Sequence, residues 1–119
     1  MIERLPGRLL RLEGLAVAAG ALVLYFDAGY GWLALLLLAL APDLSALGYV
    51  AGPRVGALTY DLAHTYAWPV ALGVGGVLAE SGTTTQLARI WLAHIGVDRL
   101  VGYGLKYPTG FRDTHLQRV

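Results

Sequence analysis

Several histidine and aspartate residues have spacings that could build a metal site. His94 and Asp98 are four residues apart, so they share one face of a helix. His64 is related in the same way to Asp61, three residues before it. Asp43 follows a proline, which loosens the local helix and can turn the carboxylate inward. Imidazoles and carboxylates that converge from different helices suit a divalent metal ion. We therefore predict a metal centre with these ligands: Asp43, His64, His94 and Asp98.

The donor set limits which metal ions fit. The chain has no cysteine, which excludes disulfides, thiolate ligands and a cysteine nucleophile. Zn, Mn, Fe or Ni suit the remaining donors better than a soft ion such as Cu(I), and two histidines argue against a pure Mg or Ca site. The competing interpretation is that His94 and Asp98 form a buried hydrogen-bonded couple that binds no ion.

Three further residues are candidates for a catalytic role beside such an ion. Either Glu13 or Asp61 is predicted to serve as the general base, and the planar guanidinium of Arg99 is predicted to bind an anionic group. Each residue has a structural alternative. Asp61 could be a charge near a helix N-terminus, and Glu13 could pair with an arginine at the membrane interface. Arg99 could form an ion pair with Glu13 or Asp43.

The C-terminal region has the features of an exit from a membrane. Its glycines permit a sharp turn, and its tyrosines suit the aromatic belt at the interface. Lys106 can extend to the interface or bind an anionic headgroup. His115 lies near the end of the chain, where a flexible tail is the default expectation. It is a candidate additional ligand only if the tail folds back.

The composition indicates an integral membrane protein. Of 119 residues, 56% are hydrophobic and 14% are charged, whereas soluble domains have about 25% charged residues. No Asp, Glu, Lys or Arg occurs in 28–42 or 62–79. A soluble globule, a disordered chain and a coiled coil are therefore poor fits. The net charge of +1 indicates no nucleic-acid surface, so the lipid bilayer is the expected partner.

Four stretches are long and apolar enough to span a bilayer. They are Leu9–Phe26, Gly31–Val50, Val55–Ala79 and Gln86–Tyr103. Short connections make neighbouring helices antiparallel, which predicts an all-α, up-down four-helix bundle in a single transmembrane domain over residues 1–119. Gly14 and Ala18 have the spacing of small residues that brings helices close together. No small-residue cleavage site precedes a soluble mature domain, so a cleaved signal peptide is not expected.

The positive charges predict an orientation. Of nine Lys and Arg residues, only Arg89 falls on the side opposite to the two termini. Both termini are therefore expected in the cytoplasm, in a multi-pass protein. At a rise of about 1.5 Å per residue, six ionisable groups within the spans lie in the cytoplasmic half: Glu13, Asp43, Asp61, His64, His94 and Asp98. This coincidence predicts a pocket that opens to the cytoplasm.

Two functions fit such a pocket. The first is a membrane-bound metalloprotein, which as a metal-dependent hydrolase would act on a lipid headgroup or another amphiphile through a bound water with a pKa of about 7. The second is a non-enzymatic membrane protein with a hydrogen-bonded polar core, either an oligomeric proton or ion pathway or an assembly subunit. The apolar outer half favours a pocket over a pore within one chain. A pore between the chains of a homo-oligomer is still an alternative.

The tail sequence resembles a known family. The run HIGVDRLVGYGLKYP, which begins at His94, is followed by Asp113-Thr-His115-Leu. These runs are similar to the signature of an uncharacterised family of small bacterial integral membrane proteins, domain of unknown function 4260. The earlier runs APDLS and YDLAHT, which begin at Ala41 and Tyr60, also resemble it. The resemblance covers nearly the whole chain, implies a location in the bacterial inner membrane and implies no activity.

A more distant resemblance is to the inner-membrane metal-dependent hydrolases. Those proteins carry a Pro-Asp motif, a Thr-His segment and a His-x-x-x-Asp pair that leads into a glycine and a proline. The resemblance implies metal-binding roles for Asp43, His64, His94 and Asp98. This chain departs from the pattern, because Asp43 has no second aspartate nearby and His64 precedes Thr65. The resemblance therefore supports metal binding more than hydrolysis.

Overall fold

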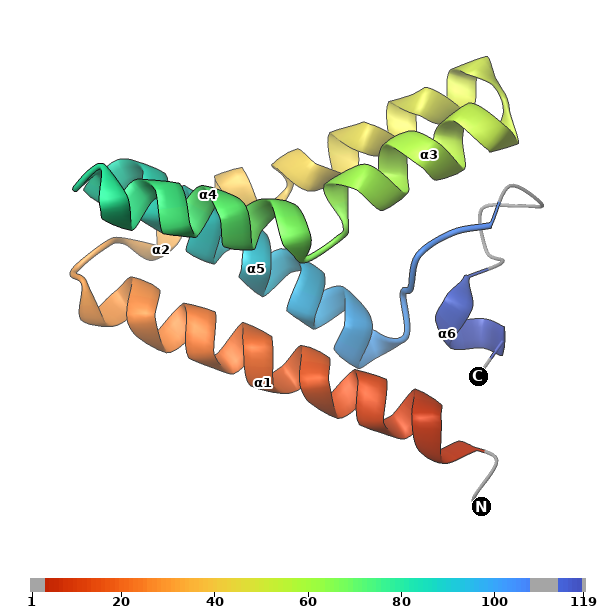
Figure 1. Ribbon diagram of the computed structural model, residues 1–119, viewed down its shortest axis with the longest axis horizontal. Helices are drawn as coiled ribbons and strands as arrows, with labels where there is room; N and C mark the ends of the chain where they lie inside the picture. The colour runs from red at the N-terminus through yellow and green to blue at the C-terminus, as the bar shows by residue number, and fades with distance from the viewer. Residues whose placement is uncertain (1–3, 108–113, 119) are drawn as a thin grey trace.

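The computed structural model describes residues 4–107 and 114–118, and these residues are helical apart from short connections. In chain order the helices are α1 (Leu5–Asp27), α2 (Trp32–Ala39), the 3-10 helix η2 (Ala41–Ala51), α3 (Pro53–Ala63), α4 (Ala67–Leu78), α5 (Gly82–Val101) and α6 (His115–Arg118). Helix α5 lies in the middle, with α1 along one side and α4 along the other (Figure 1). The predicted all-α class is confirmed for the described residues, in which an isolated bridge between Lys106 and Thr114 is the one β-type pairing.

The third predicted span is two helices rather than one. Helix α3 ends at Ala63 and α4 begins at Ala67. Pro69 lies in the first turn of α4, where its missing amide costs no hydrogen bond. In a continuous helix its ring would clash with the carbonyl of residue 65, four positions earlier. The chain therefore leaves the helix over residues 64–66.

The second predicted span also changes its form. Helix α2 ends at Ala39, and the chain continues as the 11-residue 3-10 helix η2. Pro42 lies in the first turn of η2, and its ring would clash with the carbonyl of residue 38 in a continuous α-helix. A 3-10 run of this length is uncommon, because its hydrogen bonds are poorly aligned. The helix that carries Asp43 is thus the least regular long element among those described.

Small residues let α1 approach α5 closely. A Cβ atom built on Gly14 would lie 2.6 Å from the carbonyl oxygen of Gly96. A Cβ atom on Gly96 would lie 2.7 Å from the amide nitrogen of Ala18. These backbone contacts confirm the close approach that the spacing of Gly14 and Ala18 predicted. They also fix the position of α5, which carries His94 and Asp98.

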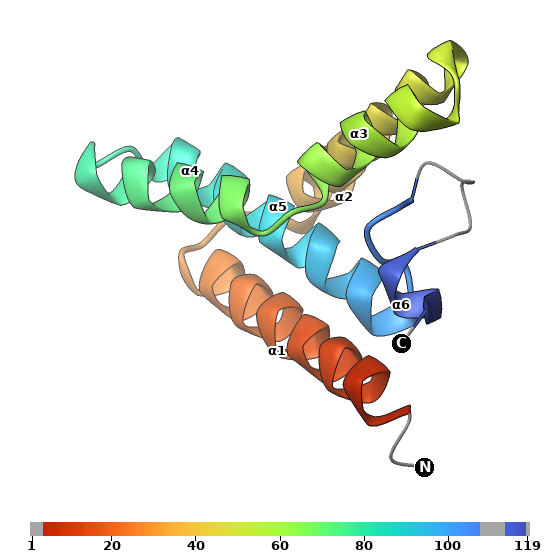
Figure 2. The same cartoon turned by 45° about the vertical axis from the view of Figure 1, so that its right-hand side comes forward.

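Helices η2 and α3 form a hairpin that rises away from the α1–α5 pair (Figure 2). The turn between them is Gly52, whose φ of +112° suits a residue without a side chain. Gly56 packs against the ring of Tyr49, and the Thr59 hydroxyl donates a 2.7 Å hydrogen bond to the carbonyl of Ser45. The hairpin brings the start of η2 next to the end of α3.

Two helices are long and apolar enough to cross a membrane. They are α1 and the helix Trp32–Ala51, which joins α2 to η2. The most apolar window of Trp32–Ala51 has no buried residue, and Leu37 and Leu47 are 66% and 68% exposed. A core helix of a soluble protein buries such residues, so this exposure suggests association with a membrane. Helices α3 and α4, with 11 and 12 residues, are each too short to span a bilayer alone.

Candidate metal centre

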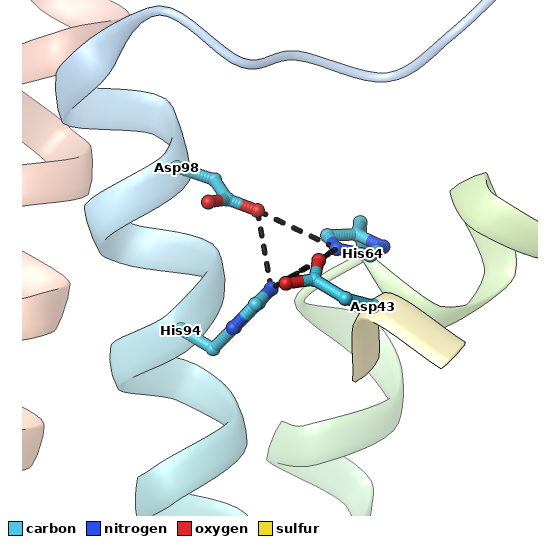
Figure 3. A group of neighbouring side chains, drawn as sticks. All are labelled: Asp43, His64, His94 and Asp98. Carbon is cyan, nitrogen blue, oxygen red and sulfur yellow. Dashed lines mark hydrogen bonds and ion pairs between the residues drawn. The ribbon is translucent and has the colours of Figure 1, made fainter. Parts of the chain in front are cut away.

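Four side chains that lie far apart in the sequence meet at one point. Asp43 lies in the first turn of η2, and His64 is the C-cap residue directly after α3. His94 and Asp98 lie on successive turns of α5. One ligand atom from each of the four lies within 4.8 Å of every other. Figure 3 shows the four side chains pointing toward one another across the gap between α5 and the end of α3.

Five of the six distances between these atoms fit a tetrahedral ion, and all four atoms lie within 4.8 Å of one another. The two Nε2 atoms of His64 and His94 are 3.1 Å apart. His94 Nε2 lies 3.1 Å from Asp43 Oδ1 and 3.2 Å from Asp98 Oδ2, and His64 Nε2 lies 3.4 Å from each of the same oxygens. A tetrahedral ion with ligands at about 2.0–2.1 Å separates those ligands by about 3.3 Å. The cluster therefore has the size of a four-coordinate site.

A backbone hydrogen bond orients the ring of His64. Its Nδ1 atom lies 2.8 Å from the carbonyl oxygen of Tyr60, which can only accept. In the neutral ring Nδ1 therefore carries the proton, and Nε2 presents a lone pair to the cluster. The ring of Tyr60 stacks on the imidazole with centroids 3.7 Å apart and planes within 8°. A metal-binding histidine is usually oriented by such a bond from its second nitrogen.

Acceptor atoms dominate the cluster. Asp43 and Asp98 contribute carboxylate oxygens, and neutral His64 contributes a lone pair. The His94 ring also bonds to the Ala39 carbonyl, so its Nε2 presents a lone pair in the tautomer whose proton is on Nδ1. Two carboxylates so close together require compensation by a cation or by added protons. A divalent ion balances the two negative charges without adding a proton.

Side chains of α5 hold the break between α3 and α4 in place. The indole nitrogen of Trp91 donates a 2.5 Å hydrogen bond to the carbonyl of Ala63. Arg99 Nη2 donates a 3.0 Å hydrogen bond to the carbonyl of His64. These carbonyls lack helical partners because the helix ends here, and the two bonds satisfy them. The segment that presents His64 is thus tied to the helix that presents His94.

Arg99 is buried next to the main chain of His64. It is 7% exposed, its guanidinium lies 5.6 Å from the ring centroid of Tyr66, and its hydrogen bond goes to the main chain. An ion pair of Arg99 with Glu13 or Asp43 is not among the contacts of the described residues. The observed contact positions His64 rather than an anion, so the predicted catalytic and anion-binding roles of Arg99 stay predictions.

The predicted general bases lie outside the four-residue group. Asp61 Oδ1 accepts a 2.5 Å hydrogen bond from the backbone amide of Lys106, so this carboxylate anchors the segment that follows α5. Glu13 is exposed on α1. Neither carboxylate belongs to the group that could hold an ion.

The tail folds back in the described part of the chain. Thr114 pairs with Lys106, and the Leu105 amide donates a 2.7 Å hydrogen bond to His115 Nδ1. This bond directs His115 to the main chain, and the residue is not part of the four-residue group. Burial and the positive charge of Arg99 lower the pKa of His115 below its ordinary value.

A cavity of about 300 Å³ adjoins the cluster. Its walls include two of the four residues, and the lining is Asp43, Ala46, Tyr60, Asp98, Tyr103 and Lys106. Lys106 is 5% exposed, and burial lowers the pKa of its amine, against the opposing effect of nearby carboxylates. The sequence indicated Lys106 as an anion-binding residue, and its location beside the cluster is compatible with that role.

Two residues of the site were missed at the level of sequence. Tyr60 supplies both the stacked ring and the orienting carbonyl for His64, and Trp91 caps the end of α3. Tyr60 lies four residues before His64, and Trp91 lies three before His94, so helical spacing placed both on the relevant faces. That spacing gave no sign that one acts through its backbone and the other through an indole nitrogen.

Comparison with known proteins identifies one relationship. Residues 7–119 match a family described as "Domain of unknown function (DUF4260)". No curated protein matches the chain. No solved structure matches it either.

Proposed function

The chain belongs to the DUF4260 family, whose function is unknown, and we propose that it is a membrane-embedded protein that binds one divalent metal ion. The observation that carries the proposal is a set of five 3.1–3.4 Å distances among the ligand atoms of four residues, all of which lie within 4.8 Å of one another. They are Asp43, His64, His94 and Asp98. Zn, Mn, Fe and Ni suit two imidazoles and two carboxylates.

The membrane location rests on exposed apolar surface. Val50 is 91% exposed and Leu78 is 80% exposed, and large apolar side chains are exposed on all the longer helices. Such a surface is stable in lipid and unstable in water. In the proposed arrangement both termini face the cytoplasm, since positive charges gather on that side. The broken helices α3 and α4 together make one crossing, with the freed carbonyls satisfied by α5.

Hydrolysis of an amphiphile is the activity proposed for this centre. A divalent ion held by these four residues would supply Lewis-acid chemistry to a water or substrate in the adjoining cavity. The 300 Å³ cavity beside Asp43 and Asp98 gives a substrate access to the ligand set. Asp61 is the better placed of the two proposed bases, since it is bonded to Lys106 in the cavity wall, whereas Glu13 is exposed.

The alternative is a non-enzymatic membrane protein in which the same four residues form a hydrogen-bonded polar core or part of a proton pathway. The 3.1 Å contact between His64 Nε2 and His94 Nε2 is also compatible with a shared proton. Metal content separates the two functions, because a hydrogen-bonded core is complete without an ion.

Elemental analysis of the purified protein tests the proposal. The protein is prepared without a polyhistidine tag or chelator, as wild type and as His94→Ala and His115→Ala variants. We expect about one ion per chain for the wild type and for His115→Ala, and none for His94→Ala, because His94 belongs to the proposed ligand set and His115 does not. Far less than one ion per chain in the wild type after reconstitution would favour the hydrogen-bonded core.

A further inference from the structure

The cavity beside the metal ligands has one cationic wall. Asp43 and Asp98 line it on one side, and Lys106 lines it as well. Because Asp43 and Asp98 are also members of the four-residue cluster, a ligand in this cavity lies next to any ion held there. The cavity volume of about 300 Å³ is at the lower end of the range for small-molecule sites, which suits a headgroup rather than a whole lipid.

Contacts with Asp61, Thr114 and Tyr60 help to hold Lys106 in this position. Its backbone amide donates to Asp61 Oδ1, and its backbone pairs with Thr114. Its amine lies 4.3 Å from the ring centroid of Tyr60, a cation–π contact, and Tyr60 in turn stacks on His64. The side chain is 5% exposed, so it does not extend to water as a membrane-anchoring lysine does. The ammonium is therefore fixed beside the cluster.

The charges predict when an anion can bind. Without a metal ion, the carboxylates of Asp43 and Asp98 give the cavity an excess of negative charge that repels anions. A divalent ion would neutralise these two carboxylates, and Asp61, whose Oδ1 accepts a hydrogen bond from the Lys106 amide, does not line the cavity. The metal-loaded cavity then presents a Lewis acid and an ammonium group to the same space, and such a pair binds an oxyanion.

We propose, on the basis of the metal-binding function above, that this cavity binds a phosphate group between the metal ion and Lys106. Lysine binds phosphate as a point charge, and a cation paired with a metal ion is a common clamp on phosphate oxygens. Tyr103 at the cavity is 57% exposed, and tyrosine is typical of the headgroup layer of a membrane. The phosphate comes from a phosphomonoester lipid headgroup or from free phosphate, and the experiment distinguishes these sources.

The test is calorimetric titration of Zn²⁺-loaded full-length protein in phosphatidylcholine nanodiscs with inorganic phosphate. We expect saturable binding by the Zn²⁺-loaded protein and none by the metal-free protein. Lys106→Gln should weaken phosphate binding by about tenfold or more, the loss expected for one charge-assisted hydrogen bond. Lys106→Arg should restore much of it. Arg54→Gln, which removes an exposed positive charge from the first turn of α3, is the matched control and should bind normally.

A second arm identifies the source of the phosphate. If the lipid headgroup occupies the cavity, nanodiscs that contain phosphatidic acid should raise the apparent dissociation constant for inorganic phosphate. If this constant is the same with and without phosphatidic acid, the ligand is free phosphate. Metal content is measured in every sample. Wild-type protein that retains Zn²⁺ but binds neither ligand overturns this inference and leaves the metal-binding function intact. Equal phosphate affinity in Lys106→Gln, or loss of Zn²⁺ from that variant, also overturns it. A wild type without Zn²⁺ contradicts the proposed function itself.

Discussion

The two sides of α5 hold their neighbours by different means. Toward α1, two continuous helices pack backbone against backbone through Gly14 and Gly96. Toward α3 and α4, α5 meets an interrupted helix and holds it with side-chain hydrogen bonds from Trp91 and Arg99. The regular side supplies rigidity, and the irregular side supplies His64, whose position depends on where a helix stops. His94 and Asp98 lie on the continuous helix α5, whereas His64 lies at the helix break. The four ligands therefore meet only if both the packing of α5 and the position of the break are maintained.

The largest effect should come from separating α1 from α5. In Gly96→Ala, the new Cβ would lie 2.6 Å from the carbonyl oxygen of Gly14 and 2.7 Å from the amide of Ala18, so backbone atoms must move apart. We expect a loss of about 1–3 kcal/mol in stability, measured as a lower thermal transition in detergent. Gly20→Ala is the control, because its Cβ meets nothing within 4 Å and should leave the transition unchanged or higher. Equal transitions for the two variants would contradict the close packing.

On the other side of α5, Arg99→Met should loosen the segment that presents His64 while it leaves all four proposed ligands in place. The lost hydrogen bond to the His64 carbonyl should reduce metal affinity by about 10–100-fold, the usual effect of removing a group that orients a ligand. Competition with a chelator of known affinity measures this change. Arg89→Met is the control. It removes a guanidinium on the same helix whose hydrogen bond goes to the Leu24 carbonyl, so this variant should retain its metal affinity. Equal losses in both variants would show that Arg99 has no special role.

Removing the cause of the helix break should give a smaller effect. Pro69→Ala lets a continuous helix compete with the bend at residues 64–66, which turns His64 away from α5 in a fraction of molecules. We expect metal affinity to fall by roughly tenfold with little loss of helix content by circular dichroism. Pro53→Ala, at the start of α3, is the matched proline control. An unchanged affinity in Pro69→Ala would mean that the side-chain bonds alone maintain the bend.

The smallest predicted effect is a pH-dependent release of the tail. His115 Nδ1 accepts a hydrogen bond from the Leu105 amide, so protonation of Nδ1 destroys the acceptor. Because the pKa of His115 is lowered in the folded protein, the folded state binds fewer protons than the unfolded state. The tail contact is therefore stable above the ordinary value of 6.5 and weakens as the pH falls below it.

Hydrogen exchange at the Leu105 amide measures this release. Below pH 6.5 we expect the Leu105 amide of the wild type to exchange faster than the intrinsic pH dependence of amide exchange predicts. His115→Asn offers an oxygen acceptor that does not titrate, so its exchange should follow the intrinsic trend alone. The same excess exchange in His115→Asn would assign the effect to another group.

Sequence patterns predicted the parts of the site that depend on local geometry. The i,i+4 relation of His94 and Asp98 follows from helix geometry, and both side chains reach the same point in the structure. The close approach of α1 and α5 follows from small residues, and the DUF4260 resemblance was confirmed. These predictions succeeded because each depends on a short stretch of chain or on a motif.

The rest depended on partners that a one-dimensional pattern does not reveal. The stretch Val55–Ala79 was predicted as one span because of its length and its apolar content, although Pro69 interrupts it. Arg99 was interpreted through its charge, yet its partner is a main-chain carbonyl exposed by that interruption. The tail contact pairs His115 with an amide ten residues earlier, which no helical spacing encodes. The four-span topology and the membrane orientation stay predictions.

The uneven exposure of the four ligands has a consequence for exchange kinetics. The side chain of His64 is 2% exposed and that of His94 is 9% exposed, whereas that of Asp43 is 53% exposed and stands on the weakly hydrogen-bonded helix η2. In the proposed centre an ion would leave most easily by release of the exposed Asp43 carboxylate, because the other ligands are more buried. Changes in η2 should therefore alter the residence time of a bound ion more than its coordination geometry, and the rate of metal loading should depend on this irregular helix.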